Sequence, residues 1–75
     1  MSLDLHGLTI HQGWAHFNEE VDQAFWRGVR SMRVITGKGL MLHEFPTWAS
    51  NHPKIQRIEL NRDGGSFRVW LKKNA

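Results

Sequence analysis

The first apolar residues of the chain alternate with polar ones. Leu3 and Leu5 fall on one side of an extended segment and Asp4 and His6 on the other, because successive side chains of a strand point to opposite faces. Gly7 follows and can turn the chain there without a steric penalty. The pattern predicts a short strand that ends with a carboxylate and an imidazole, at an edge that a ligand can reach.

After this strand the spacing of the apolar residues changes. Apolar residues then recur every three or four positions, which predicts an amphipathic helix over residues 10–27 that ends at Gly28. Thr9 and Gln12 have the spacing of a capping box at its start. The predicted apolar stripe consists of Ile10, Trp14, Phe17, Val21, Phe25 and Gly28.

Two residues of this helix stand out from its pattern. Gly13 lies inside the helix, where glycine costs about 0.5–1 kcal/mol relative to alanine, and it predicts a close approach of the helix to the sheet. Trp26 falls on the polar side, so its ring is expected to be exposed or covered by another segment. An exposed Trp26 would suit a protein partner.

The next two elements are a strand over residues 31–35 and a helix that starts at residue 40 or 41 and runs to about residue 51. Pro46 requires either a later start of this helix or a kink, because proline lacks the amide hydrogen that a helix interior needs. The buried side of the helix is expected to carry Phe45, Trp48 and Ala49.

Two further strands are predicted over residues 55–60 and 66–72, joined by a hairpin turn at residues 63–65. The order β-α-β-α-β-β predicts the α/β class: a two-layer sandwich with a four-stranded mixed sheet packed against two helices. The first two strands flank a helix, so a right-handed crossover makes them parallel. Residues 1–75 are expected to form one domain.

Composition narrows the class of protein. Ten Lys and Arg against seven Asp and Glu give a net charge of +3 and a pI near 10.0, which is a weak indication of a polyanionic partner. The absence of cysteine excludes a disulfide framework and a thiolate zinc site. It is compatible with a reducing compartment, and we expect a cytoplasmic protein. No apolar run approaches the roughly 20 residues of a membrane span.

Two motifs are predicted to meet at one edge of the sheet. The first strand ends at His6 and Gly7, and the second is followed by the loop Thr36-Gly37-Lys38-Gly39. The carboxyl ends of parallel strands usually hold the ligands of open α/β sheets. Glycines let backbone amides approach an anion and Lys38 adds a positive charge, so the loop predicts a phosphate site. A tight strand-to-helix turn would use the same glycines.

The polar residues of the first strand suit acid–base chemistry on such a phosphate. An imidazole titrates near neutral pH, so His6 can take a proton from an attacking hydroxyl or give one to the leaving oxygen. Asp4 either orients and charges His6 or faces the substrate. A direct contact between them is not expected, since residues two apart on a strand lie parallel and an aspartate is short. The alternative is that both are simply exposed at a strand end.

A metal site is the competing interpretation of the histidines. His6, His11 and His16 are each five residues apart, which on a helix separates neighbours by about 140°. Ligands of one metal ion must converge, as histidines four residues apart do. We therefore expect no metal site.

The last strand carries a second pattern that suits nucleic acid. Arg68, Trp70 and Lys72 alternate with core residues and share one face of the predicted strand. A row of charge, ring and charge can bind a phosphate backbone while a base stacks on the indole. The alternative is that Trp70 is covered by a neighbouring segment or by a second copy of the chain.

Together these motifs resemble those of a known family. The L-D-x-H-G box at residues 3–7, the T-G-x-G box at residues 36–39 and a helix with Pro46 and Trp48 are similar to the small MutS-related (Smr) domain. The resemblance covers nearly the whole chain. It implies a two-layer α/β domain with endonuclease activity, either DNA nicking or RNA cleavage, including cleavage of messenger RNA on stalled ribosomes.

The resemblance also implies roles for residues. Asp4 and His6 fall on the box tied to cleavage, and Gly37, Lys38 and Gly39 on the box tied to substrate binding. The chain departs from many relatives at the start of the second helix, where it lacks their arginines. Only two residues precede the first box, so the chain is expected to be either a short free-standing member or part of a larger protein.

These observations lead to one main hypothesis and one alternative. The main hypothesis is an endonuclease without a metal or cofactor, in which His6 is the general acid or base, Asp4 assists it, and residues 36–39 grip a phosphate. The alternative is a non-catalytic module that binds nucleic acid or a ribosome through the same loop and the face of Arg68, Trp70 and Lys72. A protein-interaction domain centred on Trp26 is the third possibility.

Overall fold

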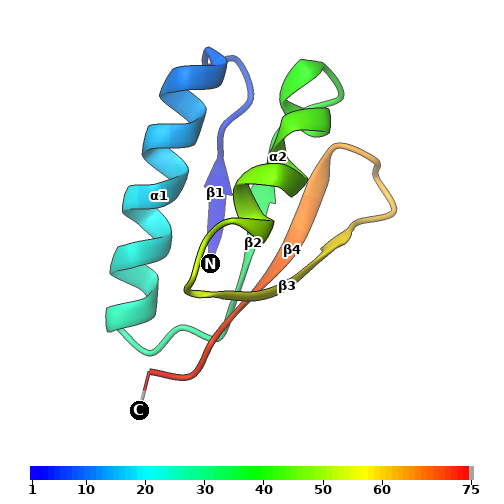
Figure 1. Ribbon diagram of the computed structural model, residues 1–75. Helices are drawn as coiled ribbons and strands as arrows, with labels where there is room; N and C mark the ends of the chain where they lie inside the picture. The colour runs from blue at the N-terminus through cyan, green and yellow to red at the C-terminus, as the bar shows by residue number, and fades with distance from the viewer. Residues whose placement is uncertain (75) are drawn as a thin grey trace.

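A computed structural model describes residues 1–74 of the chain (Figure 1). Its elements are β1 (Ser2–Asp4), α1 (Ile10–Trp26), β2 (Ser31–Ile35), α2 (Leu40–Ser50), β3 (Ile55–Leu60) and β4 (Ser66–Leu71). The predicted order of strands and helices is therefore confirmed. The main difference lies in β1, which ends at Asp4, so that His6 belongs to the following turn and not to the strand.

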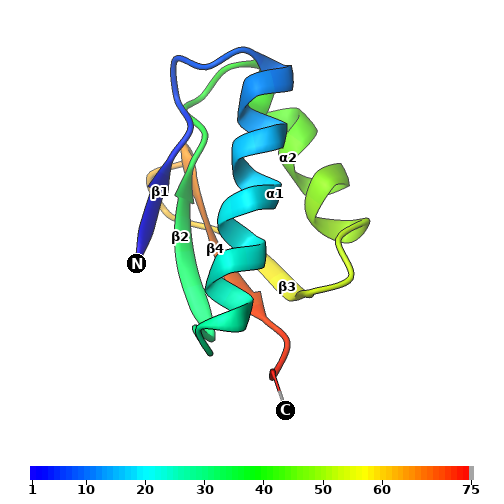
Figure 2. The same cartoon turned by 90° about the vertical axis from the view of Figure 1, so that its left-hand side faces the viewer.

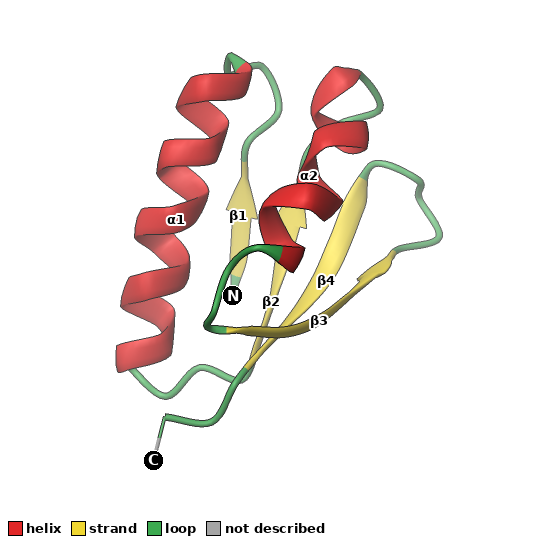
Figure 3. Cartoon of the chain, in the orientation of Figure 1, coloured by secondary structure: helices red, strands yellow, loops and turns green. Residues whose placement is uncertain are grey.

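The four strands form one mixed sheet in the order β1-β2-β4-β3. β1 and β2 are parallel, whereas β4 is antiparallel to both β2 and β3. Figure 2 shows both helices on the same side of the sheet, so the fold is the predicted two-layer α/β sandwich. No described element covers the opposite face of the sheet, which we call the open sheet face (Figure 3).

The core lies between the sheet and the helices and is built around aromatic rings. The Phe45 ring packs on its edge against Phe17, with centroids 4.9 Å apart, and stacks on Phe67 at 4.7 Å. Such pairs add to the stabilisation from buried area. The buried apolar residues are Leu3, Leu5, Phe17, Val21, Ala24, Met32, Val34, Met41, Phe45, Ala49, Ile55, Phe67, Val69 and Leu71.

The predicted apolar stripe of α1 is partly wrong. The residues of α1 that are buried are Gly13, Phe17, Val21 and Ala24. Trp14, placed in the stripe by its spacing, is 45% exposed. The buried face is turned toward Gly13 because α1 packs against α2 there: a Cβ at Gly13 would lie 2.7 Å from Met41 Cε. The close approach that Gly13 predicted is therefore to the other helix and not to the sheet.

The ends of both helices agree with the sequence patterns. Thr9 and Gln12 form the predicted capping box, with two hydrogen bonds of 3.1 Å between side chain and backbone. α2 starts at Leu40, so the later start considered for Pro46 is wrong, and proline lies inside the helix without an amide hydrogen to donate. Neither helix is long and apolar enough to cross a membrane.

Replacing Phe45 with alanine should lower the free energy of unfolding by about 3–5 kcal/mol, because it removes a fully buried ring and leaves a cavity. Urea denaturation followed by circular dichroism measures the loss. Trp26→Ala is the control, since Trp26 is 65% exposed and its loss should change stability by less than about 0.5 kcal/mol. Equal losses in the two variants would contradict this description of the core.

Candidate functional site

The parallel pairing of β1 and β2 brings the two predicted motifs together. The Leu5 amide donates to the Ile35 carbonyl at 2.8 Å, so both strands end at the same edge of the sheet. Immediately beyond, Gly37 lies beside His6: a Cβ at Gly37 would lie 3.5 Å from His6 Cβ. Gly37 also has a φ of +77°, a conformation that side chains rarely allow. A glycine is therefore required where the loop passes the histidine.

Asp4 and His6 contact each other directly, which corrects the expectation that they would not. Asp4 Oδ1 forms an ion pair with His6 Nδ1 and also accepts the His6 amide at 3.0 Å. The contact is possible because β1 ends at Asp4 and the chain then turns, so the two side chains are no longer parallel. Both side chains remain at least half exposed. The pair leaves His6 Nε2 available to a ligand.

The contact with His6 changes the pKa of the Asp4 carboxyl. The hydrogen bond from the His6 side chain, followed by that from the His6 amide, lowers the pKa of the Asp4 carboxyl below its usual value. Asp4 therefore stays ionised throughout the range in which an imidazole titrates. An ionised carboxylate at Nδ1 keeps the proton on that nitrogen and sets the orientation of the ring.

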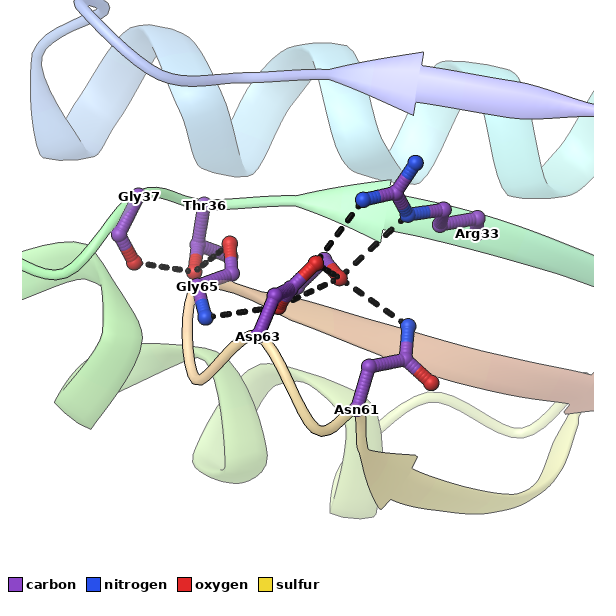
Figure 4. Close-up of polar contacts among 7 residues, drawn as sticks. Arg33, Thr36, Gly37, Asn61, Asp63 and Gly65 are labelled. Carbon is purple, nitrogen blue, oxygen red and sulfur yellow. Dashed lines mark hydrogen bonds and ion pairs between the residues drawn. The ribbon is translucent and has the colours of Figure 1, made fainter.

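The loop after β2 is fixed by the turn between β3 and β4. The amides of Thr36 and Gly37 both donate to the Gly65 carbonyl, at 3.0 and 2.9 Å. The Thr36 hydroxyl is buried and donates to the Gly37 carbonyl at 2.9 Å (Figure 4). The two amides and the Thr36 hydroxyl are therefore already hydrogen-bonded within the protein, where they fix the shape of the loop. The residues of the loop that can contact an anion are Lys38 and Gly39.

The turn itself is held by Asp63. Its Oδ1 accepts the Gly65 amide at 2.9 Å, and its carboxylate accepts the hydroxyl of the buried Ser66 (Figure 4). Arg33 completes the network, with Nη2 2.8 Å from Asp63 Oδ2 and Nε donating to Ser66. The Gly65 amide, then the Ser66 hydroxyl and Arg33 lower the pKa of the Asp63 carboxyl to about 2. Sequence reasoning identified this segment only as a turn.

A groove of about 380 Å³ joins the two motifs. Leu8 and Leu40 are exposed along it, whereas the aliphatic stem of Lys38 runs outside, 3.4 Å from where a Cβ at Gly65 would lie. Leu8 and Leu40 make the sides of the groove apolar, whereas His6 makes one end of it polar. Its lining residues are His6, Gly7, Leu8, Thr9, Ile10, Thr36, Gly37, Gly39, Leu40 and Met41.

The residues of the last strand lie apart from this groove. Arg68 and Trp70 belong to β4 and face the open sheet face, but Lys72 follows the strand. The guanidinium of Arg57, on β3, lies 3.9 Å from the centre of the Trp70 ring, and Arg68 lies 5.6 Å from it. A neighbouring segment thus covers one face of Trp70. Sequence reasoning missed Arg57, because only the pairing of β3 with β4 places it there.

The histidines lie apart from one another along the chain and in the structure. Within residues 1–74, no group of three or more His, Asp or Glu side chains is placed to hold a metal ion. His11 stacks on Trp14 on the first turn of α1, and His52 packs against Phe17 after α2.

A two-layer α/β fold with an Asp–His pair and a glycine loop at the carboxyl edge of two parallel strands defines a class of small nuclease or nucleic-acid-binding domains. The family model of the Smr domain matches residues 3–72, and the chain belongs to this family. The crystal structure of the Smr domain of Thermus thermophilus MutS2 is similar, with a TM-score of 0.88 and 19% sequence identity. The match covers 95% of this chain and 96% of that one. The comparison with curated proteins gave no match.

Asp63 should make the stability of the protein depend on acid pH. Its folded pKa is about 2, below the ordinary 3.8, so its ionised form stabilises the fold above about pH 4, and this contribution is lost as the pH falls toward 2. Asp63→Asn cannot ionise. The difference in unfolding free energy between the two proteins, measured by urea denaturation, should therefore shrink over this window. A difference that does not change with pH would contradict the role of Asp63.

Proposed function

We propose that this Smr domain is an endonuclease that cleaves a phosphodiester in the groove between His6 and the loop of residues 36–39. The observation that carries the proposal is the Asp4–His6 pair, which lies beside Gly37 and is open to solvent. It combines a group that moves protons with a loop suited to an anion, within one groove.

His6 Nε2 moves the proton in this proposal. With RNA as substrate, Nε2 takes the proton of the 2′-hydroxyl as its oxygen attacks the adjacent phosphorus. The bond from phosphorus to the 5′-oxygen breaks, and that oxygen takes a proton from water as it leaves, so the products are a cyclic phosphate and a 5′-hydroxyl. With DNA, water is the nucleophile in place of the 2′-hydroxyl. Asp4 stabilises the imidazolium that forms, because its carboxylate stays ionised beside Nδ1.

The loop binds the phosphate through Lys38 and Gly39. Lys38 supplies a positive charge from beside the groove, because its stem lies over Gly65 and Lys38 is not among the residues that line the groove. Thr36 and Gly37 keep the loop in shape through their hydrogen bonds to the Gly65 carbonyl. Gly7 lines the same groove on the side of β1 and leaves room for the substrate backbone.

In this proposal the substrate is DNA or RNA, including messenger RNA at ribosomes. The domain acts in the cytoplasm and can be part of a larger protein. The second candidate is a binding module without catalysis. It is favoured by Arg68 and Trp70, which offer a charged and aromatic surface apart from the groove.

Replacing His6 with alanine should reduce cleavage by at least about 10²-fold, because it removes the group that transfers the proton. Binding of the uncut strand should change little. Cleavage of matched labelled DNA and RNA strands in the presence of a chelator, with the product ends identified, measures the first effect, and fluorescence anisotropy the second.

His16→Ala is the matched control, since His16 is exposed on α1 and does not line the groove. A His6→Ala variant that cuts as fast as the parent protein would refute the catalytic role. Binding by the parent protein without any product would favour the non-catalytic module.

Lys38→Met should weaken binding and reduce the slope of log K against log salt concentration by about 0.7–0.9, the change expected for one lost phosphate contact. Titrations at several salt concentrations measure the slope. Lys73→Met removes the same charge from the exposed segment after β4 and should leave the slope unchanged. If both variants change it equally, Lys38 makes no specific phosphate contact.

A further inference from the structure

Two arginines lie directly opposite each other on the open sheet face. Arg33 of β2 and Arg68 of β4 are register partners, and like charges in that position destabilise a sheet. Arg33 is held by Asp63 and Ser66. Arg68, by contrast, makes no ion pair among residues 1–74 and is exposed. The acid that faces Arg68 across the sheet, Glu59 on β3, lies 3.9 Å from Arg57 instead.

A hollow of about 160 Å³ lies between these two side chains. Its lining consists of Arg33, Arg68 and Asn61 together with Met1, Ser31 and Met32. Arg33 and Asn61 already donate to Asp63 and Ser66, but each of these side chains has further N–H groups to donate. A phosphate group offers the complementary charge and the acceptor oxygens. Glu59 lies opposite Arg68 on β3, but its carboxylate is 3.9 Å from Arg57 and exposed, which is a weak pair.

Trp70 lies next to this hollow, opposite Ser31. Arg57 places a flat guanidinium 3.9 Å from the centre of the indole ring, and a planar group of the same kind, a nucleobase, can take its place. Base stacking on aromatic rings is a common mode of single-strand binding, and Trp70 is partly exposed. Arg57 is itself exposed and can swing aside onto a phosphate.

The register of the sheet places these groups in a line that leads to the groove. Along β2, Ser31, Arg33 and Ile35 share the open sheet face, and their neighbours there are Trp70, Arg68 and Asp4. With about 3.3 Å per residue along a strand and 4.8 Å between strands, the Trp70 and Asp4 positions lie about 16 Å apart. At the 3.4 Å spacing of stacked bases this corresponds to at most about five nucleotides.

We propose that the open sheet face binds a single strand of nucleic acid across the sheet, with a base on Trp70, a phosphate between Arg33 and Arg68, and the cleaved bond at His6. The last part rests on the proposed function. A single strand is required because a base in a duplex is stacked on its neighbours and cannot lie on the indole.

The test uses the full chain and dye-labelled strands of twelve uridines or thymidines, with the matched duplexes for comparison. Trp70→Leu should weaken single-strand binding about tenfold or more. Arg68→Gln should reduce its salt slope by about 0.7. Trp26→Leu is the control, because Trp26 is exposed and belongs to α1, a helix that lies on the other side of the sheet (Figure 2). Circular dichroism and thermal unfolding establish that each variant is folded.

A folded Trp70→Leu or Arg68→Gln variant with unchanged single-strand binding would overturn the inference, as would equal binding of duplex by the parent protein. About five stacked nucleotides span the Trp70 and Asp4 positions, so binding should weaken once the strand is too short to reach from one to the other. Failure of the proposed function is recognised separately: no product forms in any assay, while the effects of Trp70→Leu and Arg68→Gln on binding persist.

Discussion

The carbonyl of Gly65 connects segments that are far apart in the sequence. It accepts the amides of Thr36 and Gly37, while the carboxylate of Asp63 holds Gly65 through its own amide. Because Gly37 lies beside His6, the turn between β3 and β4 holds the loop in place next to the histidine. The candidate site is built from three loops, and this one acceptor determines how they fit.

The contact between Asp4 and His6 depends on the point at which β1 ends. The same two residues in a continuous strand would lie side by side without contact. Since β1 ends at Asp4, the turn lets one carboxylate oxygen meet both the ring and the amide of His6. The backbone hydrogen bond fixes the turn, and the side-chain contact orients the ring.

The charges of the molecule are divided between its two layers. Three of the seven acids, Glu19, Glu20 and Asp22, lie on α1, in the helix layer. The open sheet face carries Arg33, Arg57 and Arg68, matched in number by Asp4, Glu59 and Asp63. A polyanion is therefore repelled from the acidic side of α1, whereas on the sheet side it meets arginines as well as acids. The modest net charge conceals this separation.

By itself the sequence determined the order of elements, the capping box, the two-layer class and the two motifs at one edge, because each follows from local periodicity, turn chemistry or the handedness of the crossover. The contacts that make a site were decided by the tertiary structure. The buried face of α1, the Asp4–His6 contact, the Gly65 acceptor and the cover of Trp70 by Arg57 all depend on where segments distant in the chain, or a strand end, come to lie. The periodic patterns of a strand or a helix describe neighbours within one element, so they do not show which residues of different elements come into contact.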